Sequence, residues 1–142
     1  KYKDWKGFVI GDEPREKLLF NHKNLNILGF LDHNKVSNWF IKSQIAVVCS
    51  RWQEPFGRTA LEAASCGCAV IITNRGGLPE AAPNGVKINN LSVNSVKFAI
   101  EKLINNNILR NKVQKKSFNN FYLTNRLISN KIDKYRLDLI KS

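Results

Sequence analysis

The stretch SRWQEPFGRTALEAASCGCAVIITNRGGLPE, residues 50–80, decides the fold of this chain. An apolar run at residues 45–50 leads into it, and a second apolar run, residues 69–74, lies within it. Short uninterrupted runs of this kind are typical of strands that are covered on both faces. The segment between them, residues 58–67, has helical character and ends in a glycine, the residue that often closes a helix. We therefore expect two parallel strands, neighbours or near neighbours in one sheet, joined by a helix.

Strand-like and helix-like segments alternate along the rest of the chain as well. The pattern predicts strands at residues 6–11, 25–30 and, weakly, 86–90, and helices at residues 14–21 and 34–43. From about residue 95 the pattern stays helical to the C-terminus. This alternation predicts an α/β fold: a Rossmann-like parallel sheet with helices on both faces, followed by a C-terminal helical tail. A length of 142 residues fits a single domain over residues 1–142.

The composition limits the class of protein. The formal net charge is +12, which could serve nucleic-acid binding, closeness to an anionic membrane, or a solvated surface rich in lysine and asparagine. No zinc-finger or RNP-type motif accompanies the charge, which disfavours nucleic acid. No apolar run approaches the roughly 18 residues of a membrane span. Cys49, Cys66 and Cys68 fit no disulfide framework, which favours a reducing, cytoplasmic location.

The loops after the two central strands carry the candidate site residues. In parallel sheets ligands bind outside the carboxyl ends of the strands, where residues 51–57 and 74–77 are expected. Gly57 lets a ligand approach the backbone closely, and the helix that begins beside it offers free amide groups to a phosphate. Glu62, about one turn inside that helix, can accept two hydroxyl donors at once, such as the vicinal diol of a ribose.

A structural explanation competes with a binding site. A carboxylate near a helix start, such as that of Glu54, is favoured there by the helix dipole alone. The pair Gly76-Gly77 is also common in ordinary tight turns. The sequence contains no Asp-x-Asp pair, so we expect no metal-held diphosphate.

Two motifs together carry a resemblance to a known family. EPFGRTALEA at residues 54–63 and GGLPE at residues 76–80 resemble signatures of group 1, family four glycosyltransferases, retaining enzymes of the GT-B fold. The segments FVIGDEP, NILGFLDHNKV and IAVVCSRWQEPFG are similar to the family in register too. The resemblance covers about residues 5–103 and implies the C-terminal, donor-binding half of such an enzyme.

The resemblance implies a role for each candidate residue. Glu54, the catalytic candidate, looks like the family's glutamate that contacts the hydroxyls of the donor sugar, and Glu62 looks like the one that holds the ribose. The other substrate-binding residues that it implies are Phe56, Gly57 and Arg58 at the sugar and phosphates, Phe30 and Leu31 beside the base, and Gly76 and Gly77 of a second glycine loop.

The resemblance also implies what these residues lack. The family has an N-terminal Rossmann domain for the acceptor and an Arg/Lys pair that grips the donor phosphates, and neither has a counterpart here. We therefore expect part of a larger enzyme that does not transfer sugar by itself. Arg58 or Arg75 could supply some of the positive charge, although neither matches the family's pair by position.

The expected function is donor binding in a retaining glycosyltransferase of the hexosyltransferase type. The donor substrate would be a UDP-, GDP- or ADP-sugar, with no cofactor and no metal. The expected partners are the N-terminal domain of the same enzyme and an anionic membrane surface, rather than nucleic acid. The expected setting is cell-envelope polysaccharide or glycolipid synthesis, in the cytoplasm or at the inner face of the membrane. The rival interpretation is a non-catalytic nucleotide-binding or basic nucleic-acid-binding module.

Overall fold

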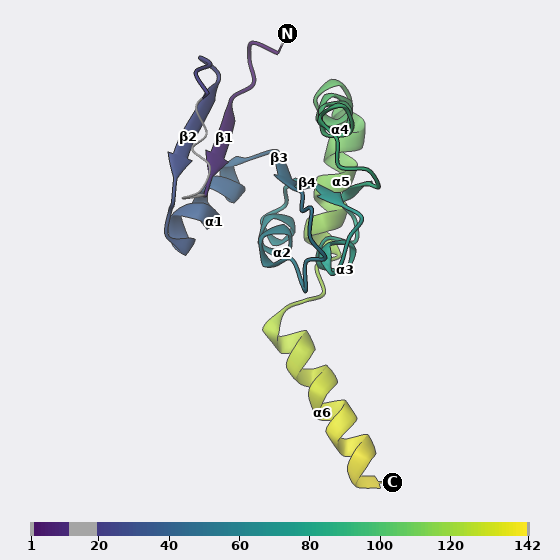
Figure 1. Ribbon diagram of the computed structural model, residues 1–142. Coiled ribbons are helices and arrows are strands. Elements are labelled where there is room, and N and C mark those ends of the chain that lie inside the picture. Colours follow the sequence, from purple (N-terminus) through teal and green to yellow (C-terminus); the bar gives the residue numbers. More distant parts are fainter. Residues whose placement is uncertain (1, 12–19, 142) are drawn as a thin grey trace. The chain divides into compact units, whose positions relative to one another are not determined.

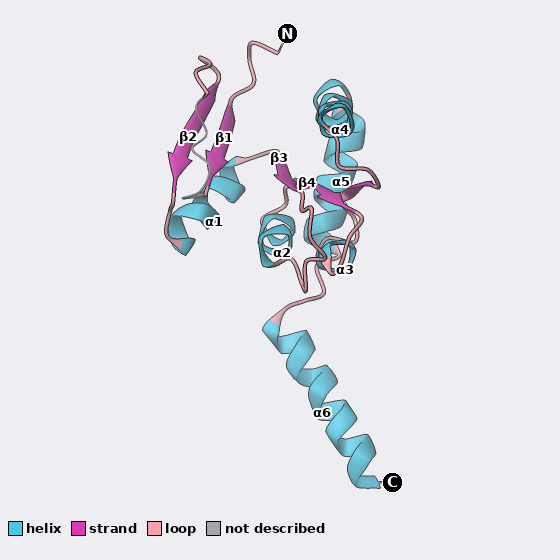
Figure 2. Ribbon diagram, viewed as in Figure 1, coloured by secondary structure: helices cyan, strands magenta, loops and turns pink. Residues whose placement is uncertain are grey.

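The computed structural model describes residues 2–11 and 20–141, which are organised in two compact units, Lys1–Trp39 and Phe40–Ser142. Figure 1 follows the chain through both units, and Figure 2 shows its helices and strands. The helix predicted at residues 14–21 lies outside the described residues, apart from its last two positions, which are not helical.

The first unit pairs two short strands in parallel. Strand β1, Gly7–Ile10, lies beside β2, Leu25–Gly29, and helix α1, His33–Lys42, follows (Figure 1). The ring of Phe8 lies near that of Trp39, with 4.2 Å between the ring centroids, so α1 contacts β1 through Trp39. The strands predicted at residues 6–11 and 25–30 and the helix predicted at residues 34–43 are confirmed.

The second unit contains a three-stranded parallel sheet. Its strands are β3 (Ile45–Val48), β4 (Ala69–Thr73) and β5 (Val86–Ile88), in the order β3-β4-β5. Both pairings are parallel, and helix α2, Arg58–Ser65, lies between β3 and β4 in the chain. The predicted strand–helix–strand unit is therefore confirmed, with its two strands as direct neighbours.

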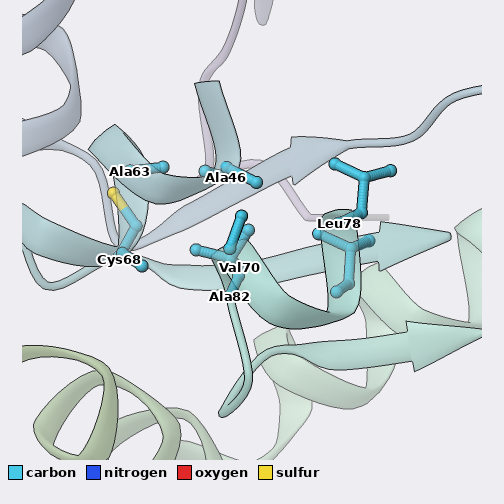
Figure 3. Packing of buried hydrophobic residues seen from close by; sticks show 10 residues of the cluster. Ala46, Ala63, Cys68, Val70, Leu78 and Ala82 are labelled. Atoms are coloured by element: carbon cyan, nitrogen blue, oxygen red, sulfur yellow. The ribbon is translucent and has the colours of Figure 1, made fainter. Parts of the chain in front are cut away.

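Helices cover both faces of this sheet at β4, as expected from its uninterrupted apolar run, whereas Val47 of the outer strand β3 is 45% exposed, so the expected coverage of both faces is not found for β3. All five residues of β4 are buried, and their side chains alternate between the two faces. Val70 and Ile72 belong to one core cluster with buried residues of α2 and of α3 (Leu78–Ala81), part of which is seen in Figure 3. Ala69 and Ile71 belong to a second cluster with residues of the helices that follow β5. The fold class predicted from the sequence is thus confirmed.

The C-terminal part is helical from residue 93 onward. Helices α4 (Val93–Asn105) and α5 (Asn107–Asn119) each begin at a side-chain cap: Ser92 accepts a hydrogen bond from the Ser95 N–H, and Asn106 accepts one from that of Leu109. Helix α6, Asn125–Lys141, follows, and all of its residues are exposed. Among the described residues, no helix combines the length and the apolar character needed to cross a membrane.

Two buried polar side chains of the second unit are bonded to main-chain carbonyl groups. The buried guanidinium of Arg110 donates to the carbonyl of Leu103 at 2.7 Å, near the end of α4. The Cys68 thiol donates to the carbonyl of Phe40 at 3.2 Å, and burial raises the pKa of this thiol to about 12. Cys68 is therefore a small core residue, whereas Cys49 and Cys66 are only half-buried; all three are free.

Candidate functional site

Two loops leave the carboxyl ends of neighbouring strands and meet at one edge of the sheet. The motif loop, residues 50–57, connects β3 to α2, and the glycine loop, residues 74–77, connects β4 to α3. Because β3 and β4 are parallel neighbours, both loops begin at the same edge. The convergence of the two loops that the sequence suggested is confirmed by the contacts between them.

The bases of the two loops are joined through a buried hydroxyl. Thr73, the last residue of β4, is 1% exposed, and its Oγ1 donates to the Ser50 carbonyl at 3.1 Å. The Ser50 N–H donates back to the same oxygen at 3.0 Å. This reciprocal pair fixes the first residue of the motif loop to the end of the neighbouring strand.

Three further hydrogen bonds join the loops beyond their bases. The Gly77 N–H donates to the Glu54 carbonyl at 2.6 Å, and the Gly76 N–H donates to Oε1 of Gln53 at 2.8 Å. The third bond runs from Nη1 of Arg75 to the Arg51 carbonyl at 2.7 Å. The guanidinium of Arg75, considered from the sequence as a charge for phosphates, thus contacts the motif loop.

Close packing explains why both positions of the glycine loop lack a side chain. A Cβ on Gly76 would meet the backbone of Glu54, with 2.6 Å to its nitrogen, and one on Gly77 would lie 2.7 Å from the Phe56 Cα. Gly57 is in contact with Leu78 in the same way, since a Cβ there would lie 2.7 Å from a methyl carbon of that side chain. In the structure, Gly76 and Gly77 therefore pack against the motif loop and donate hydrogen bonds to it.

The motif loop holds the main chain of Glu54 and leaves its carboxylate available. The Glu54 N–H donates to the Trp52 carbonyl at 3.0 Å, and the Glu54 carbonyl accepts from Gly77, so both backbone groups are bonded. The side chain is half-buried, and no hydrogen bond or ion pair within the described part of the chain engages its carboxylate. An acceptor-only group on a fixed backbone is suited to hydroxyl donors of a ligand.

Helix α2 begins where the motif loop ends. Gly57 has a φ of 86°, in the left-handed region that glycine adopts readily, and no side chain caps the helix. The first amide groups of a helix have no partner within it and carry a partial positive charge. Arg58 and Glu62 are four residues apart and therefore share a face of α2, while Ala60 and Ala63 are buried. Glu62 is half-buried, and Arg58 is exposed.

The aromatic and apolar candidate residues lie in both units of the chain. Phe56, in the motif loop, is 38% exposed. Phe30 and Leu31 follow the carboxyl end of β2 in the first unit, where Phe30 is 80% exposed and Leu31 is half-buried. Their role beside a base stays a prediction. The residues that the structure does bring together in the second unit are Glu54, Phe56, Gly57, Arg58, Gly76 and Gly77, with Glu62 on the following helix.

A small pocket elsewhere in the second unit is lined by none of these residues. It is lined by Ala64, Ala81, Ala82, Pro83, Asn84, Ser117, Asn120, Phe121, Tyr122 and Leu123. Its lining combines main-chain turns with small and aromatic side chains and has no acidic or basic group, so it offers little to a charged ligand. No group of three His, Cys, Asp or Glu side chains arranged to hold a metal was found among the described residues.

Sequence reasoning missed Gln53 and Thr73. Gln53 stands beside the glutamate, and its contact with the glycine loop depends on two segments that are far apart in the chain. In the sequence, Thr73 does not differ from an ordinary strand residue, because threonine is common in strands. A polar residue at the end of an otherwise apolar run was the one local signal that the sequence offered for it.

Comparison with known proteins relates this geometry to a family. The family described as glycosyl transferases group 1 matches residues 1–120. The GPI3 subunit of phosphatidylinositol N-acetylglucosaminyltransferase from Saccharomyces cerevisiae is 32% identical over 120 residues, which are 78% of this chain and 26% of that protein. Glycogen synthase of Mycobacterium tuberculosis is 43% identical over 82 residues, covering 58% and 18% of the two chains. This chain thus spans about a quarter or less of the length of these curated relatives.

Solved structures show the same fold. The C-terminal domain of LpcC, a glycosyl transferase group 1 family protein of Francisella tularensis, has a TM-score of 0.71 at 32% identity, over 84% of this chain and 69% of that one. Anabaena Alr3699/HepE, in complex with UDP and glucose, has a TM-score of 0.73 over 91% and 40% of the chains; at 17% identity it shows the fold alone. With its two glutamates, its paired loops and a family match over most of its length, this chain belongs to the group 1 glycosyltransferases and has the fold of a GT-B C-terminal domain.

Proposed function

We propose that this chain binds the nucleotide-sugar donor of a retaining glycosyltransferase of family four. The observation that carries the proposal is the arrangement of the motif loop: Glu54 has a fixed backbone and an unengaged carboxylate, and it lies three residues before the glycine at which α2 begins. Because the chain belongs to this family, we expect such a site to serve sugar transfer. The proposed donor is a UDP-, GDP- or ADP-sugar.

Each part of the site suits one part of a nucleotide sugar. The free amides at the start of α2, together with the exposed guanidinium of Arg58, suit the diphosphate. Glu62, one turn further along α2, can accept both hydroxyl hydrogens of the ribose. The carboxylate of Glu54 would then accept hydrogen bonds from the hydroxyls of the sugar. When the bond to the sugar breaks, negative charge grows on the leaving diphosphate, and donors already in place stabilise it without reorganising.

The proposed setting is the synthesis of a cell-envelope polysaccharide or a glycolipid. The curated relatives are named for N-acetylglucosaminyl transfer involving phosphatidylinositol and for glycogen synthesis, which supports a saccharide or lipid acceptor. In the complete enzyme an N-terminal domain would bind that acceptor. That the 142 residues alone do not transfer sugar stays a prediction.

The donor proposal predicts binding that depends on the ribose diol. We expect the chain to bind UDP, GDP or ADP, and the matching 2′,3′-dideoxynucleotide to bind at least about tenfold more weakly, because it presents no hydroxyl to Glu62. Calorimetric titration of the three diphosphates and of the dideoxy form of the best one measures this. Equal affinity for the ribo and dideoxy forms would contradict the assignment of the ribose to Glu62. Tight binding of an RNA oligonucleotide, without nucleotide binding, would support the rival basic module.

We also propose that α6 contacts an anionic membrane surface. Its residues are exposed, and Ile128, Ile132, Tyr135 and Leu139 are spaced to form one apolar stripe along the helix. The helix carries five basic residues and two acidic ones, which complements anionic lipid headgroups.

The membrane proposal predicts different effects from two substitutions that add the same charge. Ile132→Asp, in the stripe, should weaken binding to phosphatidylglycerol vesicles several-fold more than Asn130→Asp on another face of α6, because only the first also removes apolar contact. Co-sedimentation at low and high salt, with phosphatidylcholine vesicles as the neutral reference, measures this. Equal effects, or no binding to anionic vesicles, would contradict a membrane-facing α6.

A further inference from the structure

We propose that Thr73 and Gln53 are positioning residues that hold Glu54 in place for the donor sugar, through the contacts that the end of β4 and the glycine loop make with the motif loop. The inference rests on the proposed function, since it assumes that Glu54 meets the sugar. It assigns a role to two residues outside the signature motif, and it makes the glycine loop a clamp on the motif loop.

The clamp acts at three positions of the motif loop. Ser50 is held at the base by Thr73 through two bonds, of 3.0 and 3.1 Å. Gln53 is held through its side-chain oxygen at 2.8 Å, and Glu54 is held through its carbonyl at 2.6 Å. With the residue before the glutamate and the glutamate itself both bonded to consecutive glycine amides, the backbone that carries the carboxylate is tied to the glycine loop.

The Thr73 hydroxyl is buried and fully used. It is 1% exposed, donates to one carbonyl and accepts from one amide. Replacing the hydroxyl by a methyl group of similar shape leaves the amide of Ser50 without its acceptor and removes the donor from its carbonyl. Partly buried groups left without partners are costly, so the base of the motif loop would move to find new partners. A threonine at this position therefore determines where the loop starts.

The Gln53 side chain bonds through its carbonyl oxygen. A glutamate at this position keeps an acceptor for the Gly76 amide, whereas an alanine does not. If Gln53 instead contacted the donor through its NH₂ group, the glutamate variant would lose that contact as well. The pair Gln53→Glu and Gln53→Ala therefore separates positioning from direct contact with the ligand.

The glycine loop provides a matched control for the clamp. The side chain of Asn74 bonds to Oδ1 of Asn89, at 3.1 Å, after the end of β5, and makes no bond to the motif loop. Asn74→Ala therefore removes a hydrogen bond from the same loop but leaves the hydrogen bonds between that loop and the motif loop in place. It is expected to leave both donor and diphosphate binding unchanged.

The test compares two ligands across the variants. For the 142-residue chain, calorimetry gives affinities for UDP-glucose, GDP-mannose and ADP-glucose and for the matching diphosphates, and the best pair is carried forward. Thr73→Val and Gln53→Ala should lower the affinity for the sugar nucleotide by roughly fivefold to tenfold, the loss of about one hydrogen bond, and change that for the diphosphate by less than about twofold. Thr73→Ser and Gln53→Glu should restore the sugar nucleotide affinity. Circular dichroism verifies that each variant is folded.

The outcomes separate the clamp from the proposed function. A wild-type chain that binds none of these ligands overturns both. A wild-type chain that binds both ligands, with folded variants that lose both equally or neither, overturns the clamp and leaves the donor site standing. Loss of affinity for the sugar nucleotide alone in both Gln53 variants shows direct contact and overturns its positioning role, because repulsion by the charge that Gln53→Glu adds would weaken the diphosphate as well. If Thr73→Val does not fold, the two Gln53 variants decide the outcome, because Gln53 is exposed.

Discussion

Gly76→Ala is expected to lower the free energy of unfolding by about 3 kcal/mol or more, a large fraction of the stability of a domain of this size. The new Cβ would meet the backbone of Glu54 and would lie 2.9 Å from the carbonyl carbon of Gln53. These are main-chain atoms that cannot rotate away as the end of a flexible side chain can. The residue also has a φ of 52°, which adds roughly 1–2 kcal/mol of strain for a residue with a Cβ.

Gly67→Ala measures the cost of backbone strain at a positive φ without the steric clash that Gly76→Ala adds. Gly67 lies in the same unit with a φ of 81°, but a Cβ there would touch only Phe118 at an ordinary 3.8 Å. It should therefore cost about 1–2 kcal/mol, the strain alone. Denaturant unfolding of the two variants beside the wild type measures both. If Gly76→Ala costs no more than Gly67→Ala, the two loops are not packed together as described.

The central part of the fold was predictable because its signals are local. Uninterrupted apolar runs predicted β3 and β4, since a strand buried on both faces needs no polar positions. The glycine at position 67 predicted the end of α2, because its backbone adopts the left-handed conformation, with a φ of 81°. The alternation of strands and helices then implied a parallel sheet, and both loops of the site had to lie at its carboxyl edge.

The contacts that shape the site were not predictable in the same way. The hydrogen bonds from Thr73 to Ser50 and from Gly76 to Gln53 join residues 23 positions apart. Neither segment contains a local pattern that indicates which residue it will contact. The short helix α3 was also missed, because Pro79 and the glycines before it indicate a turn as readily as one helical turn. The role of Glu54 came from the family resemblance, since a carboxylate near a helix start is otherwise explained by the helix dipole, and for Glu62 the chemistry of a carboxylate offered only the possibility of a ribose diol.

The central claim is that the two glutamates hold different parts of one donor. Glu62→Ala removes hydrogen bonds to the ribose, each worth roughly 1.5–3 kcal/mol when the acceptor is charged, so the affinity for the bare diphosphate should fall at least about tenfold. Glu54→Ala should weaken binding of the sugar nucleotide and barely change that of the diphosphate, because the diphosphate has no sugar for Glu54 to meet. Glu80→Ala, at an exposed position in α3, removes the same charge as a control.

The measurement that tests this claim most directly is a calorimetric titration of the three variants and the wild type with a nucleoside diphosphate and with its sugar conjugate. We predict that Glu62→Ala weakens the binding of both ligands, that Glu54→Ala weakens only that of the sugar conjugate, and that Glu80→Ala weakens neither. With dideoxynucleotide in place of the diphosphate, wild type and Glu62→Ala should bind equally. The division of the donor between the two glutamates is contradicted if Glu54→Ala reduces diphosphate binding as much as Glu62→Ala does, or if neither substitution changes binding in a folded protein.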